Sequence, residues 1–258
     1  MEDNNLSPEL VSRDLQTRFI GQKIVYYSVL DSTMEAARRE ALWGTEAGTV
    51  ILTDEQNAAH GRFQRPWLSP KGCLALSVIL RPNIEYLPTI VMLVSLAVTY
   101  SIQVITGLQP QIKWPNDVLI NEKKVCGILI ENDIRKNSLR HMIVGIGINV
   151  NLHLPDYPEI SAIATSLSDQ LGKEVSRLDL VRQLLVEMDR LYLSLPHTDF
   201  IFDQWKKHLV TLGQTVRVNF GNTVSVGVAE SVNKDGSLMF RRKDGILVKI
   251  VAGEVSLH

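Results

Sequence analysis

The sequence predicts an α/β (α+β) protein in which a mixed sheet is flanked by helices and a small all-β module follows. Three observations support this fold class. Runs of β-branched residues alternate with amphipathic segments up to about residue 212. Hydrophobic residues make up 45% of the 258 positions, enough for a full core. From Gly213 onward, short strands alternate with Gly-Asn and Asp-Gly turns.

Changes in residue composition and hydrophobic pattern divide the chain into three parts. Residues 1–22 form a polar lead with one weak helical segment, Ser7–Arg18, and are too short to hold a helix-turn-helix. Residues 23–212 form the α/β domain, and residues 213–258 form a small β-barrel of the SH3-like kind. The net charge is −1 and the pI is about 6.6, so we expect neither nucleic acid nor an anionic membrane as a partner.

The stretch from residue 86 to residue 112 contains no charged side chain and is long enough to span a bilayer. Polar residues such as Thr89, Ser95 and Gln103 interrupt it, and no positive cluster flanks it. We therefore expect a buried core helix from about Pro88 to Thr106, with a membrane span as the alternative. The acidic, polar N-terminus does not have the pattern of a signal peptide.

The cysteine pattern indicates a reducing compartment. Cys73 and Cys126 both lie in apolar β-like runs, which favours buried thiols over a disulfide framework. We therefore expect a cytoplasmic protein. The six histidines show no metal-ligand spacing.

The first predicted strand, 23–30, leads directly into a helix. Asp31-Ser-Thr-Met-Glu35 opens this helix, with Ser32 and Glu35 spaced as a capping box, and Gly44 ends it. Ser32 is then either a cap or part of a site for a polar ligand head, because a strand-to-helix junction gathers free N–H groups and hydroxyls. Strands 49–53 and 73–80 follow.

The connection 54–67 between those two strands is too long for a tight hairpin. It carries Arg62 and Arg65, which suit phosphate or carboxylate, the stacking face of Trp67, and Gly61, which allows close backbone approach. Long loops in compact domains are either functional or mobile, so the alternative is a solvated loop without a binding role.

The stretch Lys113–Glu131, KWPNDVLINEKKVCGILIE, predicts a strand, a turn and a strand. Pro115 cannot donate a ladder hydrogen bond and belongs at the entrance of the first strand. Lys113, Asn116 and Asp117 gather beside a buried sheet, and a phosphate-bearing ligand needs such groups. The alternative is a charged hairpin end that faces solvent.

The segment 141–151 predicts a strand with one bare face. At period two, Val144, Ile146 and Ile148 point to the core, whereas Gly145 and Gly147 point the other way. A ligand could lie flat against this face, and Gly127 extends it; close packing of a helix is the alternative. Helices are expected from a capping box at Ser176 to about residue 195, and over 200–212.

The hairpin motif resembles the central signature of biotin protein ligases. KWPND followed by K-x-x-G-I-L-x-E is specific to that family, and three further segments match in order: 31–33, 56–72 and 145–149. The resemblance covers the chain from about residue 30 to the C-terminus. It implies a class II synthetase-like biotin/lipoate ligase catalytic domain with an SH3-like β-barrel behind it.

The resemblance also implies a reaction. Biotin and ATP would form biotinyl-5'-AMP, and a lysine of the biotin carboxyl carrier protein of acetyl-CoA carboxylase would then take the biotin. Mg²⁺ is expected with ATP, with no metal site fixed by the protein alone. The acceptor lysine is on a partner protein, and a homodimer is compatible with the resemblance.

Site residues carry over from the family motifs by position. The implied catalytic residues are Lys124, Arg62, Asp117 and Lys113. The implied biotin-binding residues are Ser32, Thr33, Met34, Gln56, His60, Gly61, Arg62, Lys124 and Gly127. The implied ATP-binding residues are Arg62, Arg65, Trp67, Asn116, Asp117, Lys124 and Asn149.

The loop departs from the family pattern G-R-G-R-x-G-R-x-W. Ala59 and His60 replace its first glycine and arginine, and Gln64 replaces its later glycine. Ala59 and Gln64 take positive φ less readily than glycine, so we expect weaker retention of the adenylate. Two other functions compete with the biotin ligase: a lipoate-type ligase and a non-catalytic biotin-binding protein. ATP–pyrophosphate exchange with biotin, with lipoate and with neither separates the three.

Overall fold

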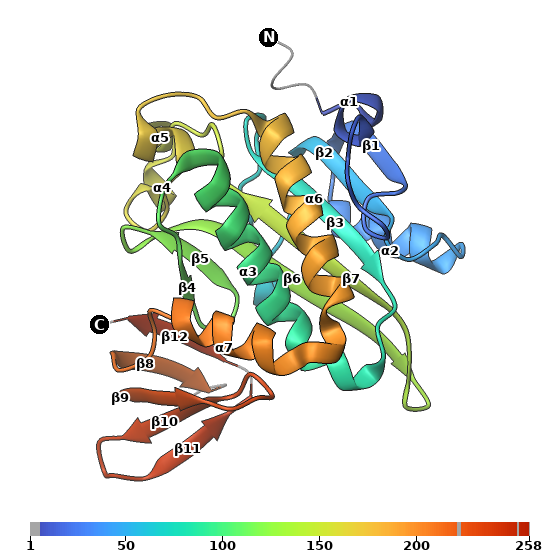
Figure 1. The fold of residues 1–258 in the computed structure, drawn as a ribbon. Coiled ribbons are helices and arrows are strands. Elements are labelled where there is room, and N and C mark those ends of the chain that lie inside the picture. Colours follow the sequence, from blue (N-terminus) through green and yellow to red (C-terminus); the bar gives the residue numbers. More distant parts are fainter. Residues whose placement is uncertain (1–5, 221–222, 252, 258) are drawn as a thin grey trace.

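The computed structural model describes residues 6–220, 223–251 and 253–257. A seven-stranded mixed sheet forms the larger part, with strand order β1-β2-β3-β7-β6-β5-β4 (Figure 1). Its strands are β1 (Ile24–Leu30), β2 (Val50–Gln56), β3 (Leu74–Leu80), β4 (Gln111–Lys113), β5 (Asp117–Ile120), β6 (Lys123–Arg135) and β7 (Ser138–Ile148). β1 and β2 run parallel, and every other pair in this sheet is antiparallel. The predicted mixed sheet is confirmed.

Helices pack on both faces of this sheet (Figure 1). The α-helices of the described residues are α1 (Pro8–Ser12), α2 (Thr33–Leu42), α3 (Leu87–Thr106), α4 (Pro158–Ser161), α5 (Leu167–Leu171), α6 (Arg177–Leu193) and α7 (Thr198–His208). The Ser176 side chain accepts from the backbone N–H of Asp179, so the N-cap predicted for α6 is present. Sequence analysis placed a helix over Ser7–Arg18, but α1 ends at Ser12, where turns replace it.

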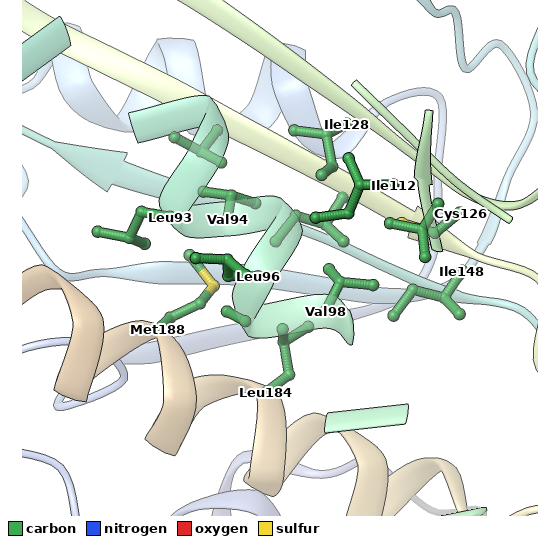
Figure 2. Close-up of a cluster of buried hydrophobic side chains, with 14 of the residues drawn as sticks. Leu93, Val94, Leu96, Val98, Ile112, Cys126, Ile128, Ile148, Leu184 and Met188 are labelled. Carbon is green, nitrogen blue, oxygen red and sulfur yellow. The ribbon is translucent and has the colours of Figure 1, made fainter. Parts of the chain in front are cut away.

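The main hydrophobic core lies between the sheet and the layer of α3 and α6. Figure 2 shows residues of α3, such as Val94 and Val98, between sheet residues such as Ile148 on one side and Leu184 and Met188 of α6 on the other. By length and composition the stretch Ile84–Thr106 could cross a membrane, but 67% of its most apolar window is buried inside the protein. The expected core helix is therefore the correct interpretation of this stretch.

The opposite face of the sheet is only partly covered. Helix α2 packs there through Ala37 and Ala41 against Ile51, Ile79 and Ile143. Sequence alternation predicts this division, because Val144, Ile146 and Ile148 face the main core and the intervening glycines face away. The uncovered part of this face is where the candidate site lies.

The C-terminal residues form a separate five-stranded antiparallel sheet with strand order β11-β10-β9-β8-β12. The strands are β8 (Thr215–Phe220), β9 (Thr223–Val232), β10 (Leu238–Arg242), β11 (Leu247–Ile250) and β12 (Glu254–Leu257). The small all-β module is confirmed, although sequence analysis missed β12. The predicted turn at Gly221-Asn222 lies outside the described residues.

A tryptophan from the central motif joins the two sheets. Trp114 is 2% exposed; its backbone N–H donates to Oγ1 of Thr211, and its indole N–H donates to the carbonyl of Gly236. Val210 also donates its N–H to the carbonyl of Ile112. The motif therefore fixes the C-terminal sheet against the end of the large sheet.

The N-terminal lead is part of the folded domain. The buried carboxylate of Asp189 on α6 accepts the backbone N–H groups of Arg18, Phe19 and Ile20 at 2.9, 2.8 and 2.7 Å. The Phe19 ring stacks on Tyr192 with centroids 5.0 Å apart. These contacts tie the lead to α6, which its polar composition did not predict.

Candidate active site

A cavity of about 340 Å³ opens on the uncovered face of the large sheet. It brings together every residue that the motifs placed in the site. These are Ser32, Thr33, Met34, Gln56, His60, Gly61, Arg62, Arg65, Trp67, Lys113, Asn116, Asp117, Lys124, Gly127 and Asn149. They come from four separate segments of the chain, so the fold supports treating the motifs as one site.

The cavity floor is a row of paired residues that crosses the sheet. Ala75 pairs with Gly147, Gly147 with Gly127, Gly127 with Asp117, and Asp117 with Lys113. Three positions with almost no side chain thus lead to a carboxylate and an ammonium. In an adjacent row, Ser77 pairs with Gly145 and Gly145 with Leu129.

Side chains of the protein itself lie on the glycines. A Cβ on Gly147 would stand 2.6 Å from Nε1 of Trp67, and a Cβ on Gly145 would stand 2.5 Å from Sδ of Met34. The face without side chains was expected to contact a ligand. In the structure, Trp67 and Met34 pack directly on its glycines. Within the described residues, the buried Nε1 of Trp67 has no hydrogen-bond partner.

A β-bulge turns Lys124 toward the cavity. Val118 pairs with Cys126 and Leu119 with Lys124, so Val125 has no partner on β5. Val125 and Cys126 are both buried in the main core, while Nζ of Lys124 lies beside Gly127 on the cavity face. The sequence alternation alone would have placed Lys124 on the core side with Cys126.

The ammonium of Lys124 is held over the floor by two groups. Its Nζ lies 2.6 Å from Oδ1 of Asp117 and 5.2 Å from the ring centroid of Trp67. Its backbone N–H donates to Ile163, and its carbonyl accepts from Thr165. The main chain around this lysine is therefore fixed on both sides.

The other end of the cavity is a chain of neutral hydrogen bonds. Oε1 of Gln56 accepts from the backbone N–H and the hydroxyl of Thr33 at 2.9 and 3.2 Å. Nε2 of Gln56 donates to Ser69, and the hydroxyl of Ser77 donates to Thr33. Sequence analysis missed Ser69 and Ser77, which nothing in their local sequence distinguishes from ordinary strand and loop serines.

The expected capping box at Ser32 is wrong. Ser32 occupies the N-cap position of α2, but its side chain makes no capping hydrogen bond. Gln56 supplies the side-chain oxygen that accepts from the first turn instead. The Ser32 hydroxyl, which is buried and lines the cavity, therefore does not serve the helix.

The 57–68 loop is a compact hairpin-like structure. Gly61 donates to Arg65, Trp67 donates to Ala59, and Arg62–Gln64 form a 3₁₀ turn. Both Phe63 and Gln64 adopt a φ of 57°, in the left-handed region that favours glycine. The replacement of the family's glycine by Gln64 therefore puts strain in the turn, as the sequence predicted, whereas Ala59 has no positive φ and the same expectation is wrong there.

Arg62 reaches from this loop across the cavity. Its Nη1 donates to Oδ1 of Asn116 at 3.2 Å and to the carbonyl of Gly253 at 3.0 Å. Val255 and Ser256 of β12 also line the cavity. The C-terminal sheet therefore forms part of the cavity wall, a contribution that sequence analysis did not foresee.

Asn149 lies at the end of β7, where its amide Nδ2 donates to the carbonyl of Thr165 at 3.0 Å. Lys113 and Arg65 line the cavity on its charged side, and His60 lies beside Gly61 with Nδ1 3.4 Å from that residue's carbonyl. Ile160, Ile163 and Ala164 add an apolar wall that the motifs did not include.

The side chains that line the cavity could hold a metal ion only together with the phosphates of a bound substrate. Among the described residues that line the cavity, Asp117 is the single carboxylate, and no cluster of three potential metal ligands was found in the described part of the chain. One carboxylate beside substrate phosphates is the usual protein contribution to a Mg²⁺ site.

Thiol chemistry is not supported at this site. Cys73 and Cys126 are free and buried, and burial raises the pKa of the Cys73 thiol to about 12. Burial also raises the pKa of the Cys126 thiol. Neither sulfur forms the thiolate that a nucleophile requires.

Comparisons with known proteins found similar proteins over most of the chain. The biotin/lipoate A/B protein ligase family matches residues 26–149, and the biotin protein ligase C terminal domain matches residues 211–258. The bifunctional ligase/repressor BirA of Bacillus subtilis is 34% identical over 98% of this chain and 79% of its own length. The biotin--[acetyl-CoA-carboxylase] ligase of Paracoccus denitrificans is 31% identical over 87% of this chain and 96% of its own.

Solved structures share the fold. The biotin protein ligase of Aquifex aeolicus, in complex with biotin and ATP, superposes with a TM-score of 0.79 at 30% identity. It covers 92% of this chain, and 99% of its own chain is matched.

Proposed function

This chain belongs to the biotin/lipoate A/B protein ligase family, and specifically to its biotin protein ligases. We propose which residues of its cavity carry out each step in joining biotin to a protein lysine. The observation that carries the proposal is the floor row, which runs from small residues to Asp117 and Lys113. A neutral hydrogen-bonding end and a cationic end thus lie in one cavity.

The neutral end suits the ureido ring of biotin. That ring offers one carbonyl acceptor and two N–H donors in a plane. Ser32, Thr33 and Gln56 provide hydroxyl and amide groups that can match them, and Ser77 and Ser69 orient Thr33 and Gln56. Met34, resting on Gly145, forms the apolar wall beside this end.

The cationic end suits the bond-forming step. An oxygen of the biotin carboxylate attacks the α-phosphorus of ATP, the bond to pyrophosphate breaks, and biotinyl-5'-AMP forms. Lys124 lies over the floor where it can bridge the carboxylate and the α-phosphate, and Arg62 adds a second cation. Lys113 and Arg65 also line the cavity and would extend the positive charge, while Trp67 and Asn149 would contact the nucleotide. Catalysis then consists mainly of positioning and charge stabilisation.

The second step transfers biotin to the acceptor. The neutral amine of a lysine attacks the acyl carbon of the mixed anhydride, and AMP leaves with the bonding electrons. In this proposal Asp117, whose Oδ1 lies 2.6 Å from Nζ of Lys124, accepts the proton that the attacking nitrogen loses. Mg²⁺ bound with ATP would neutralise phosphate charge, and Asp117 is the residue that would help to hold it.

The acceptor in this proposal is the biotin carboxyl carrier protein of acetyl-CoA carboxylase. The acetyl-CoA carboxylase ligase of Paracoccus denitrificans, matched over 96% of its length, supports this choice. The two free, buried cysteines support action in the cytoplasm.

The test is ATP–pyrophosphate exchange in the purified protein with biotin, with lipoate, or with no acid added. Exchange with biotin alone is expected, and the mass of a carrier domain should then rise by one biotinyl group on a lysine. Exchange with lipoate instead would support the lipoate-type alternative. Biotin binding without exchange would support a non-catalytic biotin-binding protein, and either result would refute the proposal.

A further inference from the structure

Two distant parts of the chain hold the guanidinium of Arg62. Nη1 donates to Oδ1 of Asn116, which lies between β4 and β5, and to the carbonyl of Gly253, which precedes β12. A guanidinium is always protonated and presents its donors in a fixed plane. Acceptors on both the motif loop and the C-terminal sheet therefore set where the positive charge of Arg62 lies.

The rest of Asn116 is bound to strand β6. Its Nδ2 donates to the carbonyl of Ile128 at 2.7 Å, and the N–H of Ile128 donates to the Asn116 carbonyl at 3.1 Å. These two bonds pin the residue from both sides and leave Oδ1 directed at Arg62. Turning the amide toward a nucleotide would break the bonds to Ile128 and to Arg62.

We infer that Asn116 is a positioning residue that acts through Arg62 and does not contact the nucleotide, with the carbonyl of Gly253 as the second support. This inference rests on the proposed function, because it explains how the cation on the phosphate side is held in place before substrate binds. A preorganised charge needs no rearrangement when the α-phosphate arrives. The assignment of Asn116 to nucleotide binding, implied by the family motif, is thereby revised.

A double-mutant cycle tests the inference. Arg62→Ala, Asn116→Ala and the double variant are each loaded with biotinyl-5'-AMP, and the dissociation rate of the adenylate is measured. Arg62→Ala should speed dissociation by ~10–100-fold, as expected for the loss of one charge-assisted contact. Asn116→Ala should speed it by only ~3–10-fold, because the guanidinium remains and the carbonyl of Gly253 still holds it. The double variant should match Arg62→Ala, because the effect of Asn116 passes entirely through the guanidinium.

Two further measurements separate positioning from damage to the fold. The urea midpoints of Arg62→Ala and Asn116→Ala should fall no further below wild type than that of a control variant outside the cavity, so that faster release in these variants does not come from a weakened fold. Asn151 is the matched control, since its amide exchanges two hydrogen bonds with Val175 outside the cavity. Asn151→Ala should lower stability without changing adenylate release. If Asn116→Ala does not fold, Asn116→Ser takes its place in the cycle.

The outcomes are distinct. Effects of Asn116 and Arg62 that multiply in the double variant, or normal adenylate release by a folded Asn116 variant, would overturn the inference alone. A wild-type protein that forms no biotinyl-5'-AMP from biotin and ATP would overturn the proposed function and the inference with it.

Discussion

A single methyl group at Gly147 should disrupt the cavity floor. A Cβ built there would lie 2.6 Å from Nε1 and 2.8 Å from Cε2 of Trp67, well inside contact distance. β7 is paired on both sides at this point, with Ala75 and with Gly127, so the backbone has little freedom to move away. In Gly147→Ala the indole must therefore rise from the floor into the cavity.

The size of the effect follows from the contacts that change. Overpacking a well-filled site costs about 1–3 kcal/mol, and replacing glycine in a strand returns about 0.5–1 kcal/mol. We expect a net loss of unfolding free energy of about 0.5–2 kcal/mol. In the wild-type structure Nζ of Lys124 lies 5.2 Å from the centroid of the Trp67 ring. In the variant the displaced ring loses this contact and occupies part of the cavity that the substrate needs. Biotin-dependent ATP–pyrophosphate exchange should therefore fall at least ~10-fold, which exceeds what the stability change alone explains.

The assay compares urea unfolding with the exchange rate. Gly61→Ala is a useful contrast for stability, because a Cβ there meets no atom closer than 3.9 Å and its φ is −99°. Adding Trp67→Leu to Gly147→Ala should restore stability by removing the colliding ring. A Gly147→Ala protein with wild-type stability and wild-type exchange would refute the view that the glycine exists to seat Trp67.

Four other outcomes are expected. Lys124→Ala should abolish biotin-dependent exchange and leave the urea midpoint close to wild type; unchanged exchange would remove its assigned role. Gln64→Gly should stabilise the protein by about 1 kcal/mol in urea unfolding, because φ is 57° there, and should slow adenylate dissociation; a destabilised variant would contradict this. Asp189→Ala should cost at least ~2 kcal/mol, because three backbone N–H groups of the lead lose their acceptor, and limited proteolysis should then cut the lead first. Burial lowers the pKa of His141 and outweighs the opposing effect of Asp133, so the unfolded chain binds this proton more readily. The contribution of His141 to stability is therefore present above its ordinary pKa of about 6.5 and is lost as pH falls below it. His141→Gln should show a smaller drop in urea midpoint between pH values of about 7.5 and 5.5 than wild type, and an equal drop would contradict the assignment.

The sequence predicted which residues meet in the cavity, because chemistry and backbone pattern coincide in the motifs. Alternating glycines in β7 predict a face that carries no side chains, and the charged entrance of the 113–131 hairpin predicts a polar group beside that face. The cavity accordingly contains Lys124, Asp117 and Thr33 together. The helices and strands were predictable for a similar reason, since long periodic runs leave few alternatives.

What the sequence did not predict depends on distant contacts. The last strand, β12, became part of the cavity wall only because the C-terminal sheet packs against Trp114. The lead was expected to be a polar segment with one weak helix, yet a carboxylate 170 positions away from Phe19 binds its backbone. Neither contact leaves a periodic signal in the sequence, because a backbone donor or acceptor is the same at every residue.

The bulge at Val125 shows how a local irregularity decides the chemistry. Strict alternation would put Lys124 on the same face as the buried Cys126, where its charge could not be solvated. One extra residue in β6 lets Val125 and Cys126 both fill the core and directs the ammonium to Asp117. A charged residue two positions from a buried cysteine is thus a sign, readable in the sequence, that the strand is irregular there. The mismatch between strict alternation and the charge of Lys124 also points to Lys124 as the functional residue, because the burial of Val125 and Cys126 fixes its position.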